Sequence, residues 1–170
     1  MISTAAHEAG HAVAAFYAGI PATPLEIVVL PPCGTCEAPK ARGRNQGVHL
    51  GIASAEDTLR MLAAGVQAEL LWAEDLGPLT DAEQWAIEVG GLDDQGHARA
   101  VAESLRDYGW PLLDYGPPGP DPQPWNWPHQ CNRARAAARL WRPQVEILSN
   151  RLVQDRRLAA ADITALLNNF

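Results

Sequence analysis

The chain has 170 residues, 47% of them hydrophobic, which suits a single domain over residues 1–170 with a sizeable core. Its 20 acidic side chains outnumber its 13 basic ones, for a formal net charge of -7, and this balance argues against nucleic acid as the main partner. No run approaches the roughly 18 apolar residues of a membrane-spanning helix, and neither a signal peptide nor a disulfide framework is indicated, so we expect a cytoplasmic protein without a membrane span.

The first expected element is a helix over residues 3–18, with Ser3 or Thr4 as its N-terminal cap. It contains His7-Glu8-Ala9-Gly10-His11, which fits the zinc-hydrolase pattern H-E-x-x-H. Side chains at i and i+4 lie on one face of a helix, so the two imidazoles can bind one Zn²⁺ while Glu8 reaches a metal-bound water. The alternative is a helix that carries two histidines by chance. Gly10 would let another element approach this helix closely.

A small β hairpin is expected next. The β-branched run at residues 25–30 has the length of a strand, and residues 48–52 are its expected partner. The long loop between them, residues 31–47, contains Cys33 and Cys36 at C-x-x-C spacing. No second C-x-x-C follows, so we favour a solvated loop without metal. A redox or metal-sensing role for the two cysteines is the alternative.

Two further helices precede a pair of aspartates. Residues 55–74 have apolar residues at helical spacing, and Glu69 is a carboxylate on that otherwise apolar helix. It would be either an ordinary exposed glutamate or a buried acid that orients a metal-bound histidine. A capping box, Thr80-Asp81-Ala82-Glu83, predicts a third helix, which Gly90-Gly91 ends.

Asp93 and Asp94 then open a fourth helix, which runs to about residue 108. An aspartate at a helix start satisfies free N–H groups, and from the same position it can be aimed at a metal. Residues 111–128 are expected to form a proline-rich loop whose tryptophans pack onto the body or line a cleft. A long helix over residues 130–155, interrupted at Pro143, and a short last helix over residues 161–167 complete the chain.

This order of motifs resembles the peptidase part of the FtsH-type zinc metallopeptidases. The resemblance rests on residues 7–12, on a small-residue stretch at 64–70 that ends near an acid, and on Gly91-Leu92-Asp93-Asp94 before an alanine-rich helix. It implies a mainly α, zincin-like helical metallopeptidase domain with a small β hairpin. It also implies a zinc metalloendopeptidase that hydrolyses flexible or unfolded polypeptide.

The resemblance also implies a role for each motif residue. His7, His11 and Asp94 would bind zinc, and Glu8 would be the general base. Glu69 would orient a ligand histidine by accepting a hydrogen bond from the ring N–H that does not face the zinc. Asp93 and His97 are the alternative ligands, and all of these residues lie in the matching segments.

Two features depart from the family. The chain has no G-x-x-x-x-G-K-[ST] loop for ATP, and Val66 replaces the family's arginine. We therefore expect a peptidase that is ATP-independent by itself, with an ATPase partner or a homo-oligomer as the route by which substrate would be brought. The alternative from another class is a non-catalytic interaction module that retains a structural or vestigial zinc site. A fourth protein ligand, such as His97, would favour that alternative.

Overall fold

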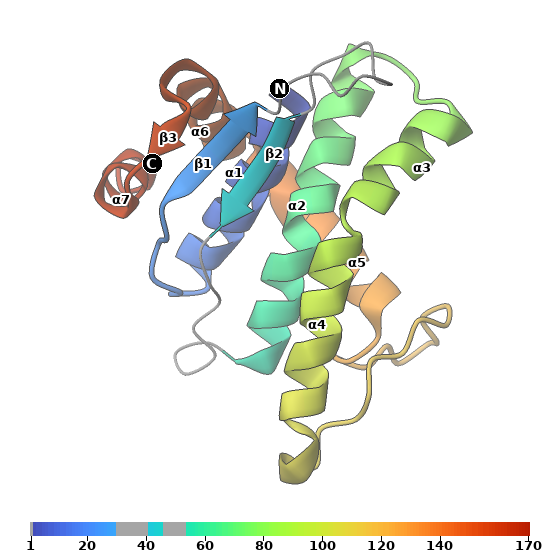
Figure 1. Ribbon diagram of the computed structural model, residues 1–170. Coiled ribbons are helices and arrows are strands. Elements are labelled where there is room, and N and C mark those ends of the chain that lie inside the picture. The colour runs from blue at the N-terminus through green and yellow to red at the C-terminus, as the bar shows by residue number, and fades with distance from the viewer. Residues whose placement is uncertain (1, 30–40, 46–53) are drawn as a thin grey trace.

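The computed structural model describes residues 2–29, 41–45 and 54–170, and within these ranges the chain is mainly helical with one small sheet (Figure 1). A mainly α fold with a small antiparallel hairpin is thus confirmed. Over the same ranges, every helix is too short or too polar to cross a lipid bilayer. In chain order the elements are α1 (Ile2–Tyr17), β1 (Leu25–Val29), β2 (Ala41–Asn45), α2 (Ala55–Leu76), α3 (Asp81–Gly90), α4 (Leu92–Ser104), the short 3-10 helix η1 (Arg106–Tyr108), α5 (Trp127–Leu140), α6 (Arg142–Asp155), β3 (Arg157–Leu158) and α7 (Ala160–Leu167).

The first helix, α1, lies under the small sheet and beside α2 (Figure 1). Small side chains line the contact between the two helices, and Ala64 and Ala68 of α2 are buried there beside Gly10. A methyl group added at Gly10 would lie 2.6 Å from both the Ala64 carbonyl oxygen and the Ala68 side chain. The close approach expected at Gly10 is therefore confirmed, and it holds the H-E-x-x-H helix firmly against α2.

The sheet has the strand order β2-β1-β3, and both pairings are antiparallel. The partner of β1 in the hairpin is β2, with Leu25 opposite Asn45 and Val29 opposite Ala41. Placing all of residues 31–47 in a loop was therefore wrong. The segment Ala41–Asn45 contains no β-branched or aromatic residue, so β propensity did not reveal it. The strand predicted at residues 48–52, and both Cys33 and Cys36, lie outside the described residues.

Local signals set several helix ends as expected. Thr80 caps α3 in a complete capping box: its hydroxyl accepts the Glu83 N–H at 3.3 Å, and the Glu83 carboxylate accepts the Thr80 N–H at 2.9 Å. The predicted interruption near Pro143 is also confirmed, because α5 ends and α6 begins around Trp141 with the proline in the first turn of α6. The Trp141 ring stacks on Tyr17 of α1 with centroids 4.5 Å apart, which fixes the break against the motif helix.

The proline-rich segment is held onto the body by its aromatic residues, which is the first of its two expected roles. Trp127 is 6% exposed, and the rings of Trp110 and Trp125 meet edge to face with centroids 6.3 Å apart. Buried Asn126 donates to Asp114 at 3.0 Å and to the Gly116 carbonyl at 2.9 Å, which closes the loop on itself. The segment follows the C-terminal end of α4 (Figure 1), whereas α4 begins near the metal-ligand candidate Asp94.

Candidate metal centre

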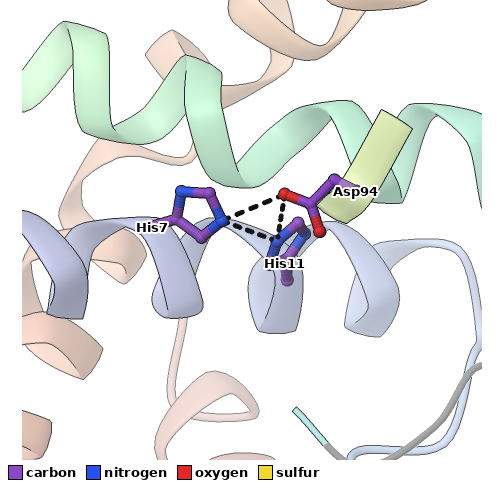
Figure 2. A group of neighbouring side chains, drawn as sticks. All are labelled: His7, His11 and Asp94. Carbon is purple, nitrogen blue, oxygen red and sulfur yellow. Dashed lines mark hydrogen bonds and ion pairs between the residues drawn. The ribbon is translucent and has the colours of Figure 1, made fainter. Parts of the chain in front are cut away.

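Two helices bring three metal-ligand side chains together. His7 and His11 lie one turn apart on α1, and their rings meet edge to face with centroids 4.8 Å apart. The first turn of α4 points the Asp94 carboxylate at both rings (Figure 2). The Nε2 atoms of the two histidines are 3.1 Å apart, and Asp94 Oδ2 lies 3.1 Å from His7 Nε2 and 3.3 Å from His11 Nε2. The structure therefore joins sites that are more than eighty residues apart in sequence.

The other nitrogen of each imidazole is held by α2. His7 Nδ1 lies 3.1 Å from the Glu69 carboxylate, and His11 Nδ1 donates to the Met61 carbonyl at 2.8 Å. The hydroxyl of Ser3 donates to the second oxygen of Glu69. Because both Nδ1 atoms carry the donated protons, both Nε2 atoms can present lone pairs to one point between them. This is the arrangement that metal-binding histidines usually have.

A glycine on α2 leaves room at that point. A methyl group added at Gly65 would lie 2.7 Å from His7 Nε2 and 2.6 Å from His11 Cε1, and still closer to His11 Nε2. Any side chain at this position would fill the space between the two ligand nitrogens. The backbone of α2 at Gly65 thus borders the space between the two Nε2 atoms, which an ion can occupy.

The helix that carries Asp94 is also fixed against α2. Gly91, at the junction of α3 and α4, is buried, and an added methyl group there would lie 3.5 Å from Val66 Cβ and closer still to one of its methyl groups. Val66 stands where the resembled family has an arginine. In this chain Val66 packs against Gly91, just before the helix that carries Asp94.

The geometry of the three ligand atoms fits zinc. A tetrahedral site with metal–ligand distances of about 2.0–2.1 Å has edges of about 3.3–3.4 Å between ligand atoms. The triangle formed by the two Nε2 atoms and Asp94 Oδ2 has edges of 3.1, 3.1 and 3.3 Å. Two imidazole nitrogens and a carboxylate oxygen are also a donor set that zinc accepts. Three atoms with lone pairs at this separation repel one another unless a cation lies between them.

Glu8 lies beside this group without belonging to it. Its side chain is 7% exposed, and its Oε2 atom has no hydrogen-bond partner among the described residues. Burial raises the pKa of the Glu8 carboxyl, while the neighbouring imidazoles of His11 and His7 partly oppose that rise. A buried carboxylate with an unused oxygen next to a metal position is suited to bind a water molecule and to take its proton.

Without a metal, a proton serves as the cation between the ligand atoms. Burial disfavours the charged form of His7, but hydrogen bonds with Asp94 and Glu69 outweigh it and raise the pKa of His7 to about 10. Burial also disfavours the carboxylate form of Asp94, but the charge of His11 and hydrogen bonds with both imidazoles hold the pKa of Asp94 well below its usual range. Zinc has to displace the His7 proton, so its binding weakens as the pH falls.

The alternative ligands take no part in the group. Asp93 and His97 are both exposed, and in the described part of the chain the cluster able to hold a metal consists of His7, His11 and Asp94. The capping role predicted for Ser3 or Thr4 was wrong, because both lie inside α1, which begins at Ile2. The hydroxyl of Ser3 instead donates to Glu69, which is 66 positions away, so that local sequence patterns could not predict the contact.

Comparison with known proteins adds no relative. No protein-family model matches the chain, and no curated protein matches it.

Glu69 gives a first prediction. Glu69→Gln keeps the shape of the side chain but removes the charge that holds the His7 ring, so zinc affinity should fall about 10–100-fold. Glu74→Gln is the matched control, since Glu74 lies on the same helix and pairs with Arg135 away from the metal centre. Competition with a chromophoric chelator measures both affinities. Equal affinities in the two variants would show that Glu69 does not position His7.

Proposed function

We propose that the protein is a zinc-dependent metallopeptidase of zincin-like architecture, similar to the FtsH-type peptidases, that hydrolyses peptide bonds in flexible or unfolded polypeptide. The observation that carries this proposal is the convergence of His7, His11 and Asp94 on one point, with the unpartnered carboxylate of Glu8 beside it. The proposed activity is independent of ATP.

In the proposed site, His7, His11 and Asp94 would hold the zinc. Bound zinc lowers the pKa of water to about 7 and polarises the carbonyl of the substrate. Glu8 takes a proton from the attacking water and gives it to the leaving amine. Its raised pKa suits both steps, because a carboxylate that accepts a proton more readily than usual is the better base. Glu69 and the Met61 carbonyl keep the two imidazoles in one orientation throughout.

The number of ligands supports a catalytic role over a structural one. A structural zinc site is closed by four protein ligands, whereas a catalytic site keeps one position open for water and substrate. The cluster among the described residues supplies three ligands. This count favours the peptidase over the non-catalytic module.

The proposal is tested by removing and restoring the metal. Protein loaded with one equivalent of zinc should cleave a reduced, denatured test protein, and a chelator should abolish the cleavage. Zinc added back should restore it, because the two helices that carry the ligands, α1 and α4, both pack on α2. Fragment patterns on a gel and mass spectrometry measure the result. Cleavage that persists in the chelator, or no cleavage by protein that holds zinc, would contradict the proposal.

A further inference from the structure

The helix α3 contacts α2 and α4 without burying any side chain fully in the described structure. None of its residues is buried, although a complete capping box holds its N-terminus. Its apolar side chains are unusually open: Trp85 is 66% exposed and Val89, one turn later, is 38% exposed. Leu92, at the start of α4, is 55% exposed. We call Trp85, Val89 and Leu92 the α3 patch. A tryptophan exposed to this extent is typical of a surface that binds a partner.

The α3 patch is held at a fixed place beside the metal centre. Leu92 and Asp94 share the first turn of α4. Buried Gly91, between the patch and that turn, packs on Val66 of α2 without room for a methyl group. One end of the patch is therefore within one helical turn of the proposed metal centre.

The stretch of sequence that contains the patch is acidic. From residue 61 to residue 98 the sequence has no lysine or arginine. Two of its carboxylates are in the metal centre, Glu69 and Asp94, and two on α2 pair with Arg135 and Arg142. The other four, some of which also accept hydrogen bonds, belong to α3 or to the first turn of α4: Asp81, Glu83, Glu88 and Asp93. A partner that matches this surface has apolar side chains for the patch and basic side chains for its rim.

Charge also favours a substrate over a second copy of the chain as the partner of the α3 patch. A two-fold dimer would set the same acidic face against itself, and the whole chain carries a formal net charge of -7. A basic, apolar polypeptide segment has no such repulsion. We propose that the α3 patch docks an extended segment of substrate that is rich in apolar and basic side chains. This inference rests on the proposed peptidase function and specifies the substrate class of the same site.

The test measures peptide binding separately from cleavage. Zinc-loaded Glu8→Gln protein is titrated with two labelled peptides of equal length and identical apolar residues, one with arginines and one with glutamates between them. Trp85→Gln in the same background removes the centre of the patch. Tyr108→Gln is the control, because Tyr108 is 86% exposed in η1, beyond the other end of α4. Fluorescence anisotropy gives each Kd.

We expect the arginine peptide to bind at least about tenfold more tightly than the glutamate peptide. Trp85→Gln should raise the Kd of the arginine peptide about tenfold. Tyr108→Gln should change nothing. An unchanged Kd in Trp85→Gln, equal binding of the two peptides, or a dimer in sedimentation that Trp85→Gln dissolves would overturn the inference. If the binding pattern holds but wild-type protein cleaves neither peptide, the docking surface stands and the proposed peptidase function fails.

Discussion

Glu8→Gln is expected to keep zinc and to lose about 10²–10⁴-fold in the rate of peptide hydrolysis, the usual contribution of a general base. The amide has nearly the same shape as the carboxylate, but it cannot take a proton from water. Glu8 is not one of the three ligand residues, so zinc affinity should stay close to that of the wild type. Zinc content by elemental analysis and kcat on an unfolded test protein measure the two effects.

The stability of this variant provides a useful control. Burial already raises the pKa of the Glu8 carboxyl, so replacing it with a neutral side chain should not destabilise the fold. Loss of activity with unchanged zinc content and an unchanged melting temperature would assign the effect to proton transfer. If zinc-loaded Glu8→Gln cleaved at the wild-type rate, Glu8 would not be the base.

Gly65→Ala should abolish tight zinc binding and lower zinc affinity at least about 100-fold. Mutation of a residue that only hydrogen-bonds a metal ligand already lowers metal affinity by up to about that factor. The added methyl group would lie 2.7 Å from His7 Nε2 and would occupy the space between the two ligand nitrogens. The imidazoles would have to rotate away, and the Glu69 and Met61 contacts oppose that rotation. Isothermal titration with zinc measures the change.

A second glycine supplies the matched control for this substitution. Gly96 lies two residues after Asp94 in α4, is exposed, and has open space where a methyl group would go. Gly96→Ala should therefore retain zinc and stabilise the protein by about 0.5–1 kcal/mol, since alanine is the better helix former. Wild-type zinc affinity in Gly65→Ala would show that the ion does not lie between the two Nε2 atoms.

Short-range patterns predicted the parts of this structure that short-range physics decides. The capping box at Thr80, the break near Pro143 and the helical spacing of His7 and His11 each depend on a few neighbouring residues. The hairpin was expected, but its second strand was misplaced because Ala41–Asn45 has a composition typical of a loop. Pairing with β1, and not propensity, makes that segment a strand.

Long-range contacts of the site were less accessible to sequence reasoning. Asp94 was selected over Asp93 and His97 by the motif resemblance, and the structure brings Asp94 alone of these three to the histidines. The link from Ser3 to Glu69 and the space above Gly65 depend on how α1 packs on α2. A glycine in a run of small residues, such as Gly65, signals a close approach of two helices, but it does not identify the group that occupies the space.

The zinc X-ray absorption spectrum of the loaded protein shows directly which atoms bind the metal. We expect one zinc per chain, bound only by nitrogen and oxygen at about 2.0–2.2 Å, with scattering from two imidazoles. Asp94→Ala should lower the affinity while the imidazole scattering remains. Sulfur at about 2.3 Å would place the metal at cysteines and would contradict a zinc site at His7, His11 and Asp94.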